Sequence, residues 1–223
     1  MRCLVVLSGE ICDDEAARLW LQTADRVICA DGGARHLRRL GVRPDLLVGD
    51  LDSIAADDLS WIREQQVPVS RFPAMKNETD SELAIQAALA DLPGPPEQHE
   101  GVILGVTGSR PDHVLANQLL AGRLAGEGWR LILTDGRSTT YTLAGGQTLN
   151  LDLPVQANPP WIVSAIPITD EIAGLTYQGL EYPLTDARLN RGSTRGLSNR
   201  PVSPAVRITL ALGVLLIVVT PEE

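Results

Sequence analysis

The sequence lacks the two glycine-rich patterns by which phosphate-binding loops are most readily found. It contains neither the GxxxxGK[ST] pattern of a Walker loop nor the GxGxxG pattern of a dinucleotide-binding fold. Any phosphate chemistry in this protein must therefore use a different device.

Cysteine is scarce, and its positions predict no disulfide framework. Cys3, Cys12 and Cys29 are odd in number and lack the spacing of metal ligands. We therefore expect these cysteines to act as small apolar residues that remain reduced, which predicts a cytoplasmic protein.

Long apolar runs are missing as well. A membrane-spanning helix needs about 20 apolar residues, and the most apolar stretch, Val206–Val219, is shorter and contains Arg207 and Gly213. We expect this stretch to form paired buried strands. The run Arg2–Leu7 is too short for a secretory signal and predicts a first strand. We therefore expect no membrane partner.

Positive charge is in short supply. The 223 residues include 19 Lys and Arg against 28 Asp and Glu, for a formal net charge of -9. Binding to nucleic acid depends on neutralising phosphates with Lys and Arg, so we expect no nucleic-acid partner. A nucleotide is not excluded, because a divalent metal can bridge carboxylates to phosphates.

Strand-like and helix-like segments alternate from residue 2 to about 134, which predicts a largely parallel sheet with helices on its faces. We expect strands at Arg2–Leu7, Arg26–Ala30, Leu46–Val48, Val67–Phe72, Val102–Leu104 and Leu131–Leu133. We expect helices at Asp13–Gln22, Ala34–Leu40, Leu59–Gln65, Ser81–Ala90 and Val114–Ala125. In the first helix, Asp13 is expected to be the N-cap, and Ala16, Leu19 and Trp20 share a face.

The character of the chain changes after residue 137. No later segment has a clear helical pattern, and short strand-like runs are separated by Gly, Pro, Asn and Asp. The predicted fold is thus an α/β N-terminal domain with a mostly parallel sheet, followed by an all-β, sandwich-like C-terminal domain.

Two acidic turns follow predicted strands. Asp50 and Asp52 come after Leu46–Val48, and Asp31 with two glycines comes after Arg26–Ala30. Ligands of open α/β sheets bind at the carboxyl ends of strands, and Mg²⁺ takes one or two carboxylates together with substrate phosphates. Asp-Gly and Gly-Asp are also common turn dipeptides, so either turn alone can be only a turn.

Two further loops, at 76–80 and 105–113, carry candidate groups. In the loop at 76–80, Asp80 can complete a metal site with Asp50 and Asp52, and Lys76 can neutralise phosphate charge. Thr79 or Asp80 can equally be only the N-cap of the following helix. In the second, Gly108 and Ser109 can present backbone N–H groups to an anion at a helix N-terminus. Arg110 can bind phosphate through two N–H groups, while Asp112 and His113 can contact nucleotide or cap the helix.

Together these segments resemble the thiamine pyrophosphokinase family. The matching motifs are Asp-Gly-Gly-Ala at 31–34, Pro-Asp-Leu-Leu-Val-Gly-Asp-Leu-Asp-Ser at 44–53, Lys-x-x-Thr-Asp at 76–80, Gly-Ser-Arg-x-Asp-His-x-x-Ala-Asn at 108–117, Gly-Leu-x-Tyr-Pro-Leu at 179–184 and Gly-Leu-Ser-Asn at 196–199. The resemblance implies an ATP- and Mg²⁺-binding catalytic α/β domain at 1–135 and a thiamine-binding, dimerising β-sandwich at 136–223. It also implies pyrophosphoryl transfer from ATP to the thiamine hydroxyl, releasing AMP, in a homodimer with active sites at the subunit interface.

The resemblance also implies roles for individual residues. The catalytic residues would be Asp50, Asp52, Asp80 and Arg110, and the metal ligands Asp50, Asp52 and Asp80. The ATP side would comprise Asp31, Gly32, Gly33, Lys76, Thr79, Gly108, Ser109, Asp112, His113 and Asn117. Ser198 and Asn199 would lie on the thiamine side. The sequence departs from the family where it has Asn77 in place of a frequent Asp and Ser109 in place of a second Gly.

Two alternatives compete with this interpretation. One is a Mg²⁺-dependent phosphohydrolase of the haloacid-dehalogenase type, with Asp50 as a covalent nucleophile. That family normally carries its Asp-x-Asp motif after the first strand, whereas here the motif follows the third predicted strand. The other alternative is a nucleotide-binding module without turnover, which the intact set of acidic residues disfavours.

Overall fold

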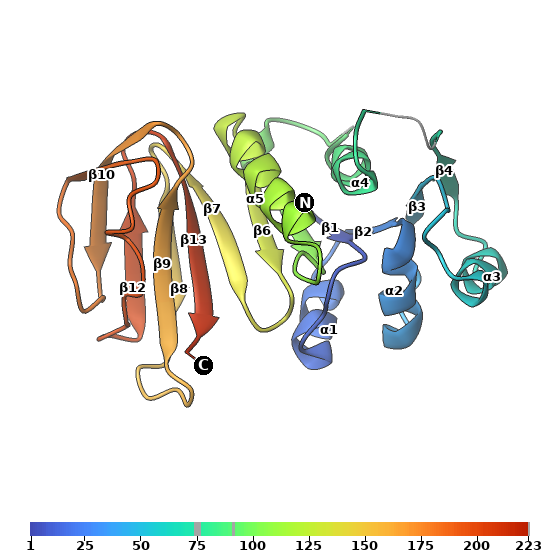
Figure 1. Ribbon diagram of the computed structural model, residues 1–223, viewed down its shortest axis with the longest axis horizontal. Coiled ribbons are helices and arrows are strands. Elements are labelled where there is room, and N and C mark those ends of the chain that lie inside the picture. Colours follow the sequence, from blue (N-terminus) through green and yellow to red (C-terminus); the bar gives the residue numbers. More distant parts are fainter. Residues whose placement is uncertain (74–76, 91, 223) are drawn as a thin grey trace. The chain divides into compact units, whose positions relative to one another are not determined.

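The computed structural model describes residues 1–73, 77–90 and 92–222 (Figure 1). The chain forms two compact units, the first of residues 1–120 and 131–137 and the second of residues 121–130 and 138–223. Across the described part of the chain, no helix has both the length and the apolar character needed to cross a membrane. The predicted fold class is confirmed, because helices and a mostly parallel sheet are followed by antiparallel sheets.

The first unit is built on a sheet with the strand order β4-β3-β2-β1-β5-β6. These strands are β1 (Arg2–Val6), β2 (Arg26–Ala30), β3 (Leu46–Gly49), β4 (Val69–Arg71), β5 (Glu100–Leu104) and β6 (Arg130–Thr134). The pairs β1–β2, β1–β5, β2–β3 and β3–β4 are parallel. The carboxyl ends of these paired strands therefore lie at one edge of the sheet.

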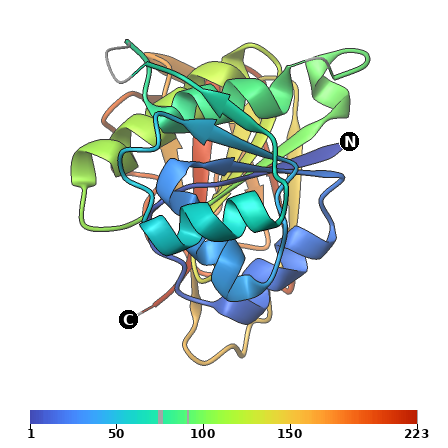
Figure 2. The ribbon, with the colours of Figure 1, turned by 90° about the vertical axis from the view of Figure 1, so that its right-hand side faces the viewer.

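Helices cover both faces of this sheet. They are α1 (Asp14–Gln22), α2 (Ala34–Leu40), α3 (Ala56–Glu64), α4 (Asp80–Leu89) and α5 (Pro111–Gly126), with short 3-10 turns at η1 (Asp31–Gly33) and η2 (Pro96–Gln98). Helix α4 lies on one face of the sheet, and α1 and α2 lie on the other (Figures 1 and 2). Covered on both sides, β1, β2 and β5 are almost wholly buried, which explains their continuous apolar runs.

Local signals explain several helix ends, and one predicted helix face is wrong. Asp13 caps α1 by accepting hydrogen bonds from the N–H groups of the second and third helical residues, at 2.9 and 3.0 Å. Gly41 ends α2 with a φ of 70°, as a left-handed C-cap glycine does. In α1, however, Ala17 and Leu21 are buried, while Leu19 is exposed.

The second unit consists of two antiparallel sheets. One has the order β7-β13-β9, with β7 at Thr139–Ala144, β13 at Val214–Pro221 and β9 at Trp161–Pro167. The other has the order β11-β10-β12-β8, formed by β11 (Ala187–Asn190), β10 (Glu171–Gln178), β12 (Ala205–Thr209) and β8 (Thr148–Asp152). Strand β11 was not expected from the sequence.

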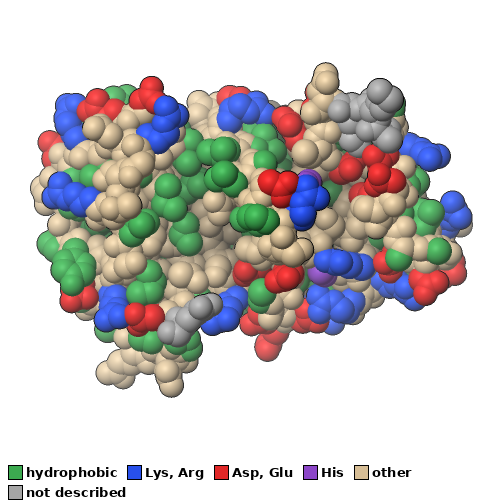
Figure 3. Space-filling view, in the orientation of Figure 1, with side chains coloured by type: hydrophobic (Ala, Val, Ile, Leu, Met, Phe, Trp, Pro, Cys, Tyr) green, Lys and Arg blue, Asp and Glu red, His purple; other side chains and the backbone are tan. Residues whose placement is uncertain are grey.

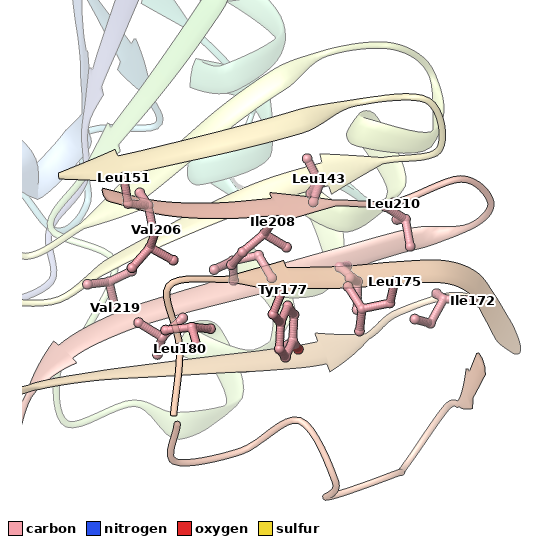
Figure 4. Close-up of a cluster of buried hydrophobic side chains, with 14 of the residues drawn as sticks. Leu143, Leu151, Ile172, Leu175, Tyr177, Leu180, Val206, Ile208, Leu210 and Val219 are labelled. Carbon is pink, nitrogen blue, oxygen red and sulfur yellow. The ribbon is translucent and has the colours of Figure 1, made fainter. Parts of the chain in front are cut away.

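A hydrophobic core contains side chains from both of these sheets. Its buried side chains include Leu143, Leu151, Leu175, Ile208 and Val219 (Figure 4). The expected pairing within Val206–Val219 is wrong, because β12 pairs with β10 and β8 whereas β13 pairs with β7 and β9. The chain turns at Gly213, with a φ of 92°, and crosses from one sheet to the other. Both strands bury apolar residues in the same core without pairing with each other.

Candidate functional site

Three carboxylates gather at the carboxyl ends of two neighbouring strands. Asp31 follows β2, and Asp50 and Asp52 follow β3, which lies beside β2 in parallel. One carboxylate oxygen from each of the three lies within 4.8 Å of the others. The sequence expectation that these acidic turns meet at one sheet edge is therefore confirmed for these three residues.

Asp31 is the buried member of this acidic cluster, with 3% of its surface exposed. Its Oδ2 accepts hydrogen bonds from the Ser53 backbone N, at 3.1 Å, and from Ser53 Oγ. Its Oδ1 is buried and has no hydrogen-bond partner among the described residues. A buried carboxylate oxygen normally has a partner, so this one fits a ligand that none of the described residues supplies.

Backbone geometry brings the cluster together at some steric cost. Asp31 and Leu51 have positive φ values of 35° and 71°, which residues with side chains seldom adopt. A Cβ placed on Gly49 would lie 2.9 Å from Cβ of Asp31, which is closer than a real side chain tolerates. Glycine at this position is therefore a requirement of the close approach between the two loops.

The acids of the cluster influence one another. The Asp52 backbone N donates to Asp50 Oδ1 at 3.1 Å. The hydrogen bond between the Asp50 and Asp52 side chains, followed by the negative charges of Asp50, Asp31 and Asp80, raises the pKa of the Asp52 carboxyl. A divalent cation would relieve this repulsion, and a set of carboxylate oxygens suits Mg²⁺. The residues present thus fit a magnesium site.

A cavity of about 650 Å³ adjoins the acidic cluster. The predicted site residues that line it are Asp52, Gly108, Ser109, Arg110, His113 and Asn117. Residues that the sequence reasoning missed also line it, among them Ser8, Gly9, Glu10, Arg35 and Ser81. The signal for the first three was available, because they directly follow the first predicted strand at the same edge of the sheet.

The loops after β1 and β5 are joined by backbone hydrogen bonds on the cavity wall. Gly9 N donates to Gly105 O at 3.1 Å, and Glu10 N donates to Thr107 O at 2.7 Å. A Cβ on Gly9 would lie only 2.1 Å from Thr107 O. The two loops therefore form one rigid wall at the N-terminal end of α5.

The remaining predicted residues of the first unit take varied positions. Thr79 is the N-cap of α4, its Oγ1 accepting from Glu82 N at 3.1 Å, and Asp80 is the first residue of that helix. Asp80 is not among the three clustered carboxylates of the described residues, but its charge acts on Asp52. Lys76 lies outside the described residues.

Arg110 is paired within its own turn. Its Nε and one terminal nitrogen donate to the two oxygens of Asp112, at 3.0 and 2.6 Å. The Arg110 guanidinium lowers the pKa of the Asp112 carboxyl to about 2. Because both side chains are exposed, at 67% and 62%, this pair is hydrated.

The two residues expected on the thiamine side differ in exposure. Ser198 has a φ of 58° and lines a cavity of about 630 Å³ in the second unit, together with Glu181, Tyr182, Arg200 and Glu222. Its backbone N donates to Ser164 Oγ at 3.0 Å. Asn199 is 4% exposed, and its side chain bonds to the backbone N–H and C=O of Tyr182.

Comparison of the sequence with protein families gives two matches. Residues 17–133, more than half of the chain, match the catalytic domain of thiamin pyrophosphokinase. Residues 151–215 match the vitamin B1 binding domain of thiamin pyrophosphokinase. The chain is also 29% identical over 191 residues to a thiamine pyrophosphokinase of Bacillus subtilis (strain 168). The aligned region covers 86% of this chain and 85% of that protein.

Solved structures have the same fold. The thiamine pyrophosphokinase of Bacillus subtilis superposes with a TM-score of 0.84 at 25% identity, covering 100% of both chains. That of Geobacillus thermodenitrificans gives 0.80 at 25% identity, covering 100% of this chain and 99% of the other. The thiamin pyrophosphokinase of Candida albicans gives 0.79 at 16% identity, covering 99% and 89%, which supports the fold alone.

Proposed function

The chain belongs to the thiamine pyrophosphokinase family and is an enzyme of that activity, and we propose that its pyrophosphoryl donor is ATP. The products would be thiamine diphosphate and AMP. The observation that carries the proposal is the acidic cluster of Asp31, Asp50 and Asp52 beside a cavity of about 650 Å³. This combination suits a nucleotide whose phosphates are held partly through a metal.

Mg²⁺ is the proposed cofactor, held by Asp31, Asp50 and Asp52, with Asp80 adding negative charge nearby. Oδ1 of Asp31 is buried and has no hydrogen-bond partner among the described residues, which supports this assignment. When bound, the ion would neutralise phosphate charge and spread the charge that develops in the transition state. The sequence expectation was Asp50, Asp52 and Asp80, so this set has Asp31 as a ligand in place of Asp80.

The protein groups have a mainly positional task in such a reaction. The thiamine hydroxyl must attack the β-phosphorus in line with the departing AMP oxygen. A carboxylate of the acidic cluster can accept the hydroxyl proton. Backbone N–H groups of the loop at Gly108 and Ser109 precede α5 and can meet phosphate oxygens at a helix N-terminus. His113 and Asn117 line the same cavity. We assign them to the nucleotide side, as the family resemblance also implies for Gly32, Gly33, Thr79 and Lys76.

Thiamine is proposed to bind at Ser198. The region that matches a vitamin B1 binding domain includes this residue, and the cavity beside it contains Glu181 and Glu222. Thiamine carries a positively charged thiazolium ring, which carboxylates complement. Arg200 pairs with Glu222 and offsets part of that negative charge.

A homodimer in a reducing cytoplasm is part of the same proposal. Exposed large hydrophobic side chains of the second unit include Tyr182, Leu197 and Val202. Hydrophobic side chains are also visible on the face of the molecule drawn in Figure 3. Cys3, Cys12 and Cys29 are all free. If each site combines the two units of different subunits, mixed dimers of Asp52→Asn and Ser198→Ala should regain about a quarter of wild-type activity from random pairing. No recovery in confirmed heterodimers would contradict a shared site.

The direct test is mass-spectrometric analysis after incubation with ATP, Mg²⁺ and thiamine. We expect thiamine diphosphate and AMP in equal amounts, and neither product when thiamine is left out. Release of inorganic phosphate without thiamine would favour a phosphohydrolase. Binding of ATP with no product would favour a non-catalytic module.

A further inference from the structure

Two arginines line the cavity beside the acidic cluster, and they differ in how their charge is compensated. Arg110 is paired with Asp112 through two hydrogen bonds. Arg35 is exposed on α2, four residues after Asp31. None of the described carboxylates forms an ion pair with Arg35. Arg35 thus brings a positive charge without an ion-pair partner among the described residues to a cavity whose lining carboxylates are Glu10 and Asp52.

Backbone carbonyls fix the orientation of this guanidinium. One terminal nitrogen of Arg35 donates to Ser8 O and to Gly9 O, the latter at 3.1 Å. Carbonyl oxygens orient a guanidinium without cancelling its charge. The other terminal nitrogen remains available to a ligand, and a planar guanidinium suits two phosphate oxygens at once.

The carbonyl that holds Arg35 is itself held by the next residue in the chain. His36 is buried, and its Nε2 lies 2.7 Å from Gly9 O. Its Nδ1 lies 3.3 Å from a terminal nitrogen of Arg39, which can only donate. Because a carbonyl oxygen can only accept, the proton is on Nε2, which donates to Gly9 O, and Nδ1 is the acceptor. Nε of Arg35 lies 3.3 Å from the same Nε2, so His36 also packs directly against the guanidinium.

This anchor is rigid because Gly9 is packed against the opposite loop. Its N–H donates to Gly105 O, and it has no room for a Cβ beside Thr107 O. The position of Arg35 is thus set by the same wall that lines the cavity. Positioned donors of this kind are the main means by which proteins stabilise transferring phosphoryl groups.

We infer that Arg35 binds the phosphate tail of the nucleoside triphosphate, as the cation facing the metal-binding acids. The inference rests on the proposed function, because it takes ATP as the ligand of this cavity. The acidic cluster can hold phosphates only through a cation, so phosphate oxygens that do not face the metal need donors from the chain. Arg35 supplies such donors with no carboxylate paired to it among the described residues, whereas Nε and one terminal nitrogen of Arg110 are engaged by Asp112 and the charge of Arg110 is offset.

The test compares binding of ATP with Mg²⁺ and binding of adenosine, both by calorimetry, in wild type, Arg35→Gln and Arg35→Lys. Arg35→Gln should weaken ATP binding at least about 10-fold, as expected when a charge-assisted bond is lost, and should leave adenosine binding unchanged. Arg35→Lys should recover only part of the loss, because ammonium cannot bridge two oxygens in a plane.

Arg38→Gln is the matched control. Arg38 is the next exposed arginine of α2, it pairs with Asp58 at 3.1 Å, and it does not line the cavity. This variant should bind ATP as the wild type does. Equal ATP affinity in Arg35→Gln and wild type would overturn the inference alone, as would an equal loss for adenosine, which would indicate a disturbed loop. If the wild type binds no ATP, the proposed donor is wrong and the inference fails with it.

Discussion

The side chain of Asn199 holds both backbone polar groups of Tyr182. Tyr182 N donates to Asn199 Oδ1 at 2.9 Å, and Asn199 Nδ2 donates to Tyr182 O at 2.8 Å. The same Oδ1 accepts from Arg200 N at 3.0 Å. The backbone of Asn199 pairs with Val163 in both directions, at 2.8 and 3.0 Å. Asn199 therefore fixes two residues that line the cavity of the second unit, which makes it a positioning residue.

Asn199→Ala should destabilise the protein and raise KM for thiamine. Loss of the side chain leaves the N–H and C=O of Tyr182 without their partner, a cost of about 1–3 kcal/mol. We expect KM for ATP to change little, because the altered cavity belongs to the proposed thiamine side. Urea denaturation and steady-state kinetics measure the two effects. Ser198→Ala, which removes an exposed hydroxyl, should keep the wild-type stability. Unchanged stability of Asn199→Ala would contradict the positioning role.

Asp50→Asn and Asp52→Asn should each lower kcat by at least about 100-fold at ordinary Mg²⁺ concentration. Each change removes a proposed carboxylate ligand and the charge stabilisation that the metal brings. Turnover as a function of Mg²⁺ measures the effect. The metal-free variants should melt no earlier than the wild type, since one of several crowded negative charges is gone. Activity close to wild type would assign the acidic cluster a structural role.

Arg110→Gln should raise the pKa of Asp112 from about 2 most of the way to its ordinary value near 3.8. The hydrogen-bonded guanidinium is the largest cause of the lowered pKa, so its removal should restore the usual titration. The carboxyl signal in an NMR titration reports this directly. High salt should move the wild-type pKa in the same direction, because the pair is exposed. A pKa that stays near 2 in the variant would mean that another group holds the carboxylate.

Stability should fall as the pH drops below about 6.5, and His36→Gln should remove part of that fall. Burial lowers the pKa of His36, so the unfolded chain takes up the proton first. The contribution is fully present above the unfolded pKa and is lost towards lower pH, by at most about 1.4 kcal/mol per pH unit. Denaturation from pH 5 to 8 measures it. Parallel curves for the two proteins would contradict this assignment.

The sequence was most informative where a local signal decides the structure. The bounds of β2 and α2 were predicted without error, because an apolar run defines the strand and Gly41 ends the helix. The meeting of Asp31 with Asp50 was also predictable, since parallel neighbours end at one edge. The bounds of β2 and α2 require no knowledge of distant contacts, and the meeting of the two acids requires only that β2 and β3 be neighbours.

Other features depend on contacts that the sequence does not display. The buried face of α1 contains Ala17 and Leu21, although Leu19 and Trp20 are equally apolar. The separation of β12 and β13 into two sheets depends on which partner strands are available. No sequence pattern indicated Arg35 as a site residue, because its inferred role depends on the carbonyls of a loop that includes Gly9, 26 residues earlier in the chain.

The close packing at Gly9 and Gly49 bears on how this enzyme would tolerate substitution. Gly9 has no room for a methyl group beside the loop after β5, and Gly49 has none beside Asp31. In a saturation-mutagenesis map both glycines would look as intolerant as Asp50, although neither has a side chain that could touch a substrate. At these positions, intolerance to substitution reflects the close spacing of loops and not a chemical role. The positions that such a map marks as essential would therefore outnumber the groups that act on the reactants.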